Sequence, residues 1–253
     1  MKALIGHTGF VGSNILRQAH FDSCYNSDNI PFIENRKFNL VVCSGISSVK
    51  WYANKYPDED MKSIQRLMKH LCTIECDQFV LLSAIDVYDR LNGVYEDDVI
   101  DVDRCDSYGR NRLYFENFIR EQFCSYILRL PTLFGRNLKK NSIYDLFCNN
   151  YSYLPDVRSK FQYYSLDCIW GDIKKCLEND IRTLNICSEP TEFSSVIKMF
   201  NISTDIFGTI RNEDMRTKHS KIWGSQTDYL YTQEYMLNKL TQFIRDYQFY
   251  SLN

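Results

Sequence analysis

The sequence predicts an α/β protein with a doubly wound parallel sheet, helices on both faces and a small C-terminal lobe. Two observations support this prediction. Short apolar runs alternate with amphipathic stretches of helical length, and the first run leads directly into a glycine-rich turn. Continuous apolar runs are typical of strands buried on both faces, which occur in sheets assembled from strand–helix–strand units. The composition is ordinary for a globular chain of 253 residues, with 44% hydrophobic and 25% charged residues.

The elements are expected in a regular order along the chain. Buried strands are predicted at 2–5, 38–43, 78–83 and 126–130, with one more near 183–187. Pro57 opens a helix whose first turn is acidic, where the helix dipole favours negative charge. Ser107 is expected to cap a helix that runs to about Phe123, and a last helix is expected near 232–247.

The turn after the first strand is the strongest functional motif. Its glycines give the spacing G-x-x-G-x-x-G, which differs from the commoner G-x-G-x-x-G. In a Rossmann-type turn the glycines let the backbone turn tightly and approach a pyrophosphate, and the helix that follows supplies amide donors. Because this turn joins the first strand to the first helix, we expect a dinucleotide to bind at Gly6, Thr8, Gly9, Phe10, Val11 and Gly12.

The residue that reads the adenosine ribose is left open by the sequence. An acidic residue is expected about 20 residues beyond the turn, at the end of the next strand. Asp28 could accept a hydrogen bond from a ribose hydroxyl, which would favour NAD, whereas Ser27 and Asn29 could hold the 2′-phosphate of NADP. A polar turn without any ligand fits the residues equally well.

Several motifs together resemble the extended short-chain dehydrogenase/reductases, in the NAD-dependent epimerase/dehydratase branch that modifies nucleotide sugars. They are the glycine turn 6–12, the strand Phe79-Val80-Leu81-Leu82-Ser83-Ala84-Ile85-Asp86-Val87-Tyr88, the segment Tyr108-Gly109-Arg110-Asn111-Arg112 and the run 128–135. The resemblance is good from residue 1 to 135 apart from the second strand, thinner to about 190 and faint beyond. It implies a Rossmann-like dinucleotide-binding domain over 1–135, and a small substrate lobe over 136–253 with some segments returning to the sheet.

The resemblance also implies a catalytic set with two departures. Tyr108 holds the position of the proton-transferring tyrosine, but Arg112 stands one helical turn on, where the family has a lysine. An arginine supplies the positive charge and can bond the ribose, yet it cannot give up a proton. Ala84 stands where the family has a catalytic serine or threonine. Asp86 lies two residues further on and is a candidate proton donor, sugar ligand or polar strand end.

Other contacts are expected at the carboxyl edge of the sheet. The resemblance implies that Ser44, Gly45, Ser83 and Pro131 contact NAD or NADP together with Tyr108 and Arg112. A nucleotide-sugar diphosphate needs cations, and the loops after two strands carry candidates. The predicted substrate-binding residues are Lys50, Trp51, Lys139 and Lys140.

The expected function is therefore an NAD(P)-dependent reductase or epimerase acting on a nucleotide sugar, of the 4-keto-deoxysugar type, in surface glycan synthesis. The alternative is a non-catalytic dinucleotide-binding or scaffold protein, because the fold and the turn are retained while positions 84 and 112 are altered.

Charge and composition narrow the partners. The formal net charge is −2 without a basic stripe, so no nucleic-acid partner is expected. No apolar run is long enough for a signal peptide or a membrane span, so we expect a cytoplasmic protein. The ten cysteines form no C-x-x-C pair, which favours free thiols over a metal site.

A homodimer is also implied by the resemblance, through the helices near 58–75 and 107–123. Candidate contacts between the subunits are Met68, Leu71, Phe115, Phe118 and Ile119. The alternative is that these side chains face their own sheet.

Overall fold

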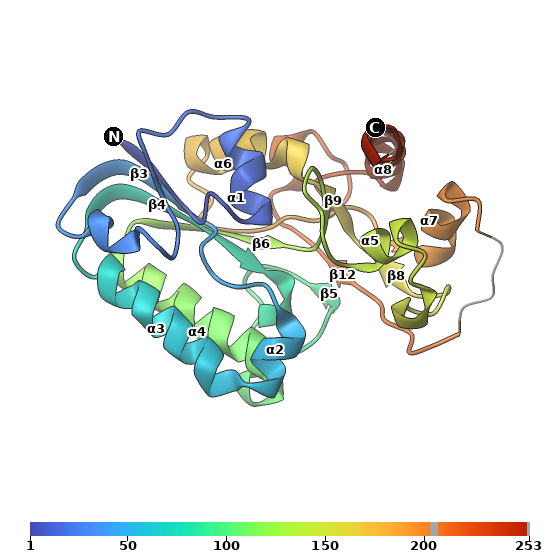
Figure 1. Ribbon diagram of the computed structural model, residues 1–253, viewed down its shortest axis with the longest axis horizontal. Helices are drawn as coiled ribbons and strands as arrows, with labels where there is room; N and C mark the ends of the chain where they lie inside the picture. The colour runs from blue at the N-terminus through green and yellow to red at the C-terminus, as the bar shows by residue number, and fades with distance from the viewer. Residues whose placement is uncertain (203–206, 252–253) are drawn as a thin grey trace. The chain divides into compact units, whose positions relative to one another are not determined.

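The computed structural model describes residues 1–202 and 207–251, and the chain forms two compact units (Figure 1). Each unit is built from separate stretches of the chain. The first unit contains Met1–Arg90, Asp97–Arg129 and Asp167–Leu184. The second contains Leu91–Glu96, Leu130–Leu166 and the described chain from Asn185 onward.

A six-stranded parallel sheet forms the centre of the first unit. Its pairings β1 with β2, β1 with β3 and β3 with β4 are parallel and in regular register, with Ile5 opposite Tyr25 on one side and Cys43 on the other. The strand order is β10 (Thr183–Asn185), β6 (Ser125–Leu130), β4 (Glu75–Ala84), β3 (Lys37–Cys43), β1 (Lys2–Ile5), β2 (Ser23–Tyr25).

This order reverses direction at β1. The chain runs from β1 outward to β2, then crosses back to β3 and continues through β4 and β6 to β10. In open α/β sheets, ligands bind outside the carboxyl ends of the strands at the point where the order reverses. That point lies at the ends of β1 and β3, which are residues 5 and 43.

Helices cover both faces of the sheet in the first unit (Figure 1). The short helix α1 (Phe10–Leu16) and α6 (Ile169–Glu178) lie on one face. The helices α2 (Lys50–Lys55), α3 (Pro57–Leu71) and α4 (Ser107–Gln122) lie on the other. This doubly wound arrangement confirms the fold class predicted from the alternating apolar runs.

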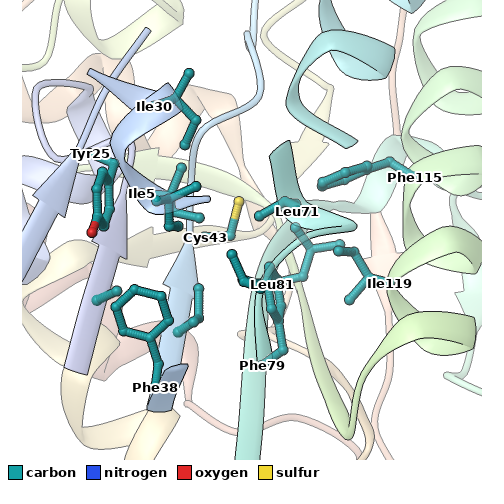
Figure 2. Close-up of a cluster of buried hydrophobic side chains, with 14 of the residues drawn as sticks. Ile5, Tyr25, Ile30, Phe38, Cys43, Leu71, Phe79, Leu81, Phe115 and Ile119 are labelled. Atoms are coloured by element: carbon teal, nitrogen blue, oxygen red, sulfur yellow. The ribbon is translucent and has the colours of Figure 1, made fainter. Parts of the chain in front are cut away.

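The main core lies between the sheet and α3 and α4. Figure 2 shows Phe115 and Ile119 of α4 and Leu71 of α3 directed toward Phe79 and Leu81 of β4. All five side chains are almost completely buried. Full burial of such a side chain stabilises the fold by roughly 1.5–3 kcal/mol, so this cluster holds α4 firmly against the sheet.

The same packing corrects the expected dimer contacts. Leu71, Phe115 and Ile119 are buried in the core of their own unit, and Met68 and Phe118 pack partly against it. For Leu71, Phe115 and Ile119 the alternative considered from the sequence, that these side chains face their own sheet, is therefore the right one. Their apolar spacing reflects intramolecular packing.

Three local details differ from the sequence-based expectation. Helix α4 is capped by Asp106, whose Oδ1 accepts from the Gly109 amide at 2.8 Å, because Ser107 is already the first helical residue. The strand β2 has only three residues, too few for a recognisable apolar run. Lys50 and Trp51 lie in helix α2, where the sequence suggested a loop.

The second unit is built from three two-stranded pairings and helices. The pairings are β7 (Thr132–Phe134) with β9 (Tyr163–Ser165), β5 (Asn92–Val94) with β12 (Asp214–Met215), and β8 (Lys160–Phe161) with β11 (Thr191–Glu192). Its helices are α5 (Ser142–Phe147), α7 (Phe193–Met199) and α8 (Gln233–Ser251). Met236, Leu240 and Ile244 repeat every fourth residue along α8 and are buried, as expected for an amphipathic helix.

Candidate active site

The glycine turn connects β1 to α1 and packs against the carboxyl end of β3. Gly6 adopts φ +85°, and a Cβ atom there would lie 2.5 Å from the Ser44 carbonyl oxygen. A Cβ on Gly12 would lie 2.1 Å from the Gly6 carbonyl oxygen. Glycine is therefore required at both positions, at Gly6 for the backbone conformation and the contact with β3, and at Gly12 for packing of α1 on the turn.

Gly9 differs from the other two glycines. It is exposed, and a Cβ placed there would lie 3.2 Å from the Gly6 carbonyl oxygen, without a second close contact outside the neighbouring backbone among the described residues. Gly9 is also the N-cap of α1, and no side chain caps this helix. The first amides of a helix have no intrahelical partner, so those of Phe10 and Val11 are suited to hold a phosphate.

Three of the other predicted cofactor residues, Ser44, Gly45 and Ser83, lie at the ends of β3 and β4. The Ser44 hydroxyl donates to the Ile5 carbonyl at 3.1 Å, which ties β3 to β1, and Gly45 follows it. Ser83 Oγ is buried and has no hydrogen-bond partner among the described residues, and the same holds for Arg112 Nε. Buried polar atoms are nearly always paired, so these two fit a site that a polar ligand completes.

The side chains around Asp28 bond one another in the turn after β2. The Asn29 side chain is occupied at both ends: its Oδ1 accepts from the Asn26 amide at 2.6 Å, and its Nδ2 donates to the Cys24 carbonyl at 3.1 Å. The Ser27 hydroxyl donates to Asp28 at 3.3 Å. Ser27 and Asp28 are both exposed in this turn, and the Asp28 carboxylate is suited to accept from a ribose diol.

Tyr108 is placed by the first turn of α4. A Cβ on the next residue, Gly109, would lie 2.0 Å from the Asp86 carbonyl oxygen, so only glycine lets α4 approach this segment. The Tyr108 amide donates to Asn54 Oδ1 of α2 at 2.8 Å, and Asn54 Nδ2 donates to Asp106 at 3.3 Å. The tyrosine ring is buried, with 6% of its surface exposed.

Asp86 lies just beyond β4. Ala84 is the last residue of that strand, and Asp86 is in the short 3-10 helix η2 (Ile85–Val87). The alternation of strand side chains therefore does not apply to Asp86. Its neighbours Ile85 and Val87 are buried, while 17% of the Asp86 side chain is exposed.

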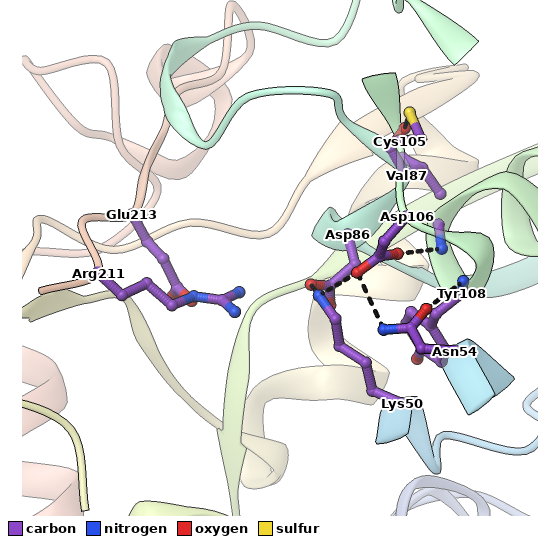
Figure 3. A network of polar contacts seen from close by, with 10 residues as sticks. Lys50, Asn54, Asp86, Val87, Cys105, Asp106, Tyr108, Arg211 and Glu213 are labelled. Atoms are coloured by element: carbon purple, nitrogen blue, oxygen red, sulfur yellow. Dashed lines mark hydrogen bonds and ion pairs between the residues drawn. The ribbon is translucent and has the colours of Figure 1, made fainter. Parts of the chain in front are cut away.

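Lys50 connects the carboxylates of Asp86 and Asp106 beside the first turn of α4 (Figure 3). Its Nζ lies 2.5 Å from Asp86 Oδ1 and 3.0 Å from Asp106 Oδ2. The same atom lies 5.9 Å from the centroid of the Tyr108 ring. Lys50 was expected to bind substrate from a loop, and instead it extends from α2 into the group of residues around the tyrosine.

Arg112 is held by a buried carboxylate. Its guanidinium forms a two-point ion pair with Asp60 of α3, in which Nη2 lies 2.9 Å from Oδ1 and Nη1 bonds Oδ2. Nη2 also donates to the Ser47 carbonyl, and Asn111 Nδ2 donates to Asp60 at 2.8 Å. The guanidinium carbon lies 4.0 Å from the Tyr108 ring centroid, so Arg112 stacks on the tyrosine while Asp60 balances its charge.

These surroundings set the protonation of the site. Burial raises the pKa of Tyr108 to about 12, and the carboxylates of Asp86 and Asp60 add to this, although the nearby Arg112 acts in the opposite direction. Burial lowers the pKa of Lys50, but its pairing with Asp86 and Asp106 outweighs this effect and leaves the pKa above its ordinary value. At neutral pH Tyr108 therefore keeps its proton and Lys50 keeps its positive charge.

The structure brings together Lys50, Ala84, Asp86, Tyr108 and Arg112 around the first turn of α4. Trp51 does not join them, since 67% of its surface is exposed and its ring meets Tyr52 edge to face. Pro131, Lys139 and Lys140 belong to the second unit, where Pro131 is buried and both lysines are exposed. The roles predicted for these three residues stay predictions.

Sequence reasoning missed Asn54, Asp60 and Asp106 as members of this group. Asp106 carried a signal, because an aspartate directly before a helix is a common N-cap. The helix dipole already accounted for an acid such as Asp60 in the first turn of its helix. No neighbouring residue indicated that Asp60 would form an ion pair with Arg112, fifty-two residues later. Asn54 carried no signal of its own.

A shallow hollow of about 380 Å³ lies elsewhere on the first unit. It is at the amino ends of β1 and β3, opposite the edge at which ligands bind in this kind of fold. We therefore do not assign the cofactor to it. Its lining residues are Met1, Lys2, Ala19, His20, Asp22, Asn39 and Trp170.

Several solved structures share this fold. A dTDP-4-dehydrorhamnose reductase from Yersinia enterocolitica aligns with a TM-score of 0.72 and 13% identity, over 95% of this chain and 98% of that one. A UDP-glucose 4-epimerase from Thermotoga maritima aligns with a TM-score of 0.68 and 13% identity, over 87% and 91%. A UDP-glucuronic acid 4-epimerase from Bacillus cereus, in complex with NAD and UDP-4-deoxy-4-fluoro-glucuronic acid, aligns with a TM-score of 0.63 and 19% identity, over 88% and 92%.

No protein-family model matches the sequence, and no curated protein is significantly similar to it. Within the described ranges 1–202 and 207–251, no helix has the length and hydrophobicity to span a bilayer. The same residues contain no cluster of three or more potential metal ligands, and all ten cysteines are free thiols.

Proposed function

We propose that this chain is an NAD-dependent oxidoreductase that reduces the keto group of a nucleotide sugar. The observation that carries the proposal is the buried Tyr108, placed beside Asp86 by Gly109 and flanked by the cations of Lys50 and Arg112. This is a proton-transfer group with its own charged surroundings at the carboxyl edge of the sheet. The solved structures that share the fold include nucleotide-sugar reductases and epimerases, which supports the substrate class.

The cofactor is proposed to bind along the ends of β1, β3 and β4. Its pyrophosphate would lie on the amides of Phe10 and Val11, over the open side of Gly9. Ser83 Oγ would gain the partner that it lacks among the described residues. When bound, the reduced nicotinamide supplies a hydride to the substrate carbon.

We infer that the cofactor is NAD. The Asp28 carboxylate after β2 is exposed, so it could accept hydrogen bonds from ribose hydroxyls and would repel a 2′-phosphate. Of the two residues that could have held such a phosphate, Asn29 is engaged with Asn26 and Cys24, and the Ser27 hydroxyl donates to Asp28.

The protonation of Tyr108 favours reduction over epimerisation. A phenol with a pKa of about 12 is protonated at neutral pH and is suited to donate its proton to a carbonyl oxygen as the hydride arrives at carbon. Epimerisation begins with the reverse step, in which the tyrosine must act as a base. The 4-keto-deoxysugars proposed from the sequence are substrates for the reductive direction.

The second candidate function is a non-catalytic dinucleotide-binding protein. It is favoured by Ala84, which removes the hydroxyl expected beside the reacting oxygen, and by the buried ion pair that occupies Arg112. Both candidates share cofactor binding, so only turnover separates them.

The experiment that tests the proposal measures NADH and NADPH oxidation with a panel of 4-keto nucleotide sugars. We expect turnover with NADH on at least one member. Tight NADH binding without turnover on any member would favour the non-catalytic function, and absence of binding to either dinucleotide would contradict both candidates.

A further inference from the structure

Ala84 leaves the proposed reaction short of one hydrogen-bond donor. As a carbonyl is reduced, negative charge develops on its oxygen, and preorganised donors aimed at that oxygen lower the barrier. Tyr108 is one such donor. A methyl group at position 84 cannot be a second, so another group must supply it if the site is efficient.

Lys50 is placed to do so. Its ammonium group lies in the same cluster as Tyr108, 5.9 Å from the ring, and 37% of its side chain is exposed. An ammonium has three donor hydrogens. Its ion pairs with Asp86 at 2.5 Å and Asp106 at 3.0 Å account for two of them.

The two carboxylates fix the direction of the lysine. Asp106 is immobilised as the N-cap of α4, through the Gly109 amide at 2.8 Å. Asp86 follows β4 directly and is flanked by the buried Ile85 and Val87. A flexible lysine held at two points loses much of its freedom, so its third hydrogen is preorganised before any ligand binds.

Arg112 is not available for the same task. Both terminal nitrogens of its guanidinium bond the buried Asp60, and one also bonds the Ser47 carbonyl. The charge of Arg112 is thus balanced inside the protein. Lys50 is the cation of this cluster with both an exposed surface and a remaining donor.

We propose that Lys50 donates a hydrogen bond to the oxygen of the substrate carbonyl, in place of the hydroxyl that Ala84 lacks. This inference rests on the proposed reductase function. In the reaction the C=O π bond breaks, a C–H bond forms with the hydride of NADH, which is oxidised, and an O–H bond forms with the proton of Tyr108. Lys50 keeps its protons, and the Tyr108 phenolate is reprotonated from solvent.

The test compares Lys50→Met with a matched control on the same helix. Lys55→Met removes the same charge from α2, and Lys55 lies outside the cluster, over the Tyr56 ring. We expect Lys50→Met to lower kcat by about 10²–10³-fold, the usual effect of losing one such donor, with NADH affinity unchanged. Lys55→Met should stay within about threefold of wild type.

A second variant makes the test specific to the missing hydroxyl. Adding Ala84→Thr to Lys50→Met restores a donor beside the substrate oxygen, so kcat should recover by about tenfold or more. A merely structural role of Lys50 predicts no recovery. If Lys50→Met does not fold, Lys50→Leu takes its place in both comparisons, because its side chain also lacks a hydrogen-bond donor.

The outcomes separate this inference from the function on which it rests. An active wild type whose Lys50 variants keep their kcat, or do not recover with Ala84→Thr, overturns the role of Lys50 alone. A wild type that binds NADH but turns over no sugar overturns the reductase function and this inference with it.

Discussion

At the scale of single residues, the chemistry depends on which groups hold protons. Tyr108 is buried against Arg112 and Asp86, and its pKa of about 12 makes it an acid rather than a base at neutral pH. Lys50 stays charged because two carboxylates surround its ammonium. The site therefore offers a proton and a positive charge to the same region, which suits a carbonyl that becomes an alcohol.

This protonation predicts the pH dependence of reduction. The active form of Tyr108 is the neutral phenol, so activity is present below its pKa of about 12 and is lost as the pH rises through that value. With NADH saturating, kcat for reduction should vary by less than about threefold between pH 6 and 9. A tenfold fall in kcat across that range would show that the donor titrates much lower and is not Tyr108 in this state.

The proposed preference for NAD over NADP rests on a single side chain. The Asp28 carboxylate would lie beside the 2′ position, and two charges about 4 Å apart repel by ~1 kcal/mol in water and ~4 kcal/mol at an effective dielectric constant of about 20. Calorimetry should therefore give NADH a Kd at least about tenfold lower than that of NADPH. Asp28→Ser should reduce the difference between the two Kd values, mainly by lowering the Kd of NADPH. Equal Kd values for NADH and NADPH in the wild type would contradict the choice of NAD.

At the scale of the elements, the three glycines of the turn have separate tasks. Gly6 and Gly12 are packed against backbone oxygens, while Gly9 is open on the side expected to hold pyrophosphate. Gly9→Val should keep the midpoint of thermal unfolding within a few degrees of the wild-type value. Calorimetry should show that it no longer binds NADH. Gly12→Ala should instead lower the thermal midpoint clearly, because its Cβ meets the Gly6 carbonyl at 2.1 Å. If Gly9→Val binds NADH as the wild type does, the turn is not the phosphate site.

Helices α3 and α4 are joined by the ion pair between Asp60 and Arg112. Removing one partner of a buried pair leaves an uncompensated charge and costs about 3–5 kcal/mol. Asp60→Ala should therefore lower the free energy of unfolding in urea by about that amount. Asp58→Ala, at an exposed acid of the same turn, should cost less than about 1 kcal/mol. Similar losses in the two variants would mean that the pair contributes no more than the helix dipole.

The sequence predicts those features of the fold and the site that depend on residues close together in the chain. The glycine turn and Tyr108 are parts of contiguous motifs, so they could be recognised from their own neighbours in the chain. Lys50 and Asp60 gain their roles from residues on distant segments, 36 and 52 positions away, which spacing alone does not bring together. The three-residue strand β2 was too short to give a pattern.

At the scale of the whole molecule, the strand order explains why the motifs converge. The sheet reverses its order at β1, so the ends of β1, β3 and β4 present the glycine turn, Ser44 and Asp86 at one edge. The residues named in the cluster around Tyr108 all belong to the first unit, and the role of the second unit in holding the sugar stays a proposal. The homodimer also stays a prediction, and light scattering at micromolar concentration tests it.

The central claim is that Tyr108 transfers a proton in an NADH-dependent reduction. Its most direct test measures NADH oxidation on a 4-keto nucleotide sugar by the wild type and by Tyr108→Phe, which removes only the hydroxyl. General acids typically contribute 10²–10⁴-fold, so kcat should fall by about that range while NADH affinity and the thermal midpoint stay unchanged. A Tyr108→Phe variant that turns over as fast as the wild type would contradict the account.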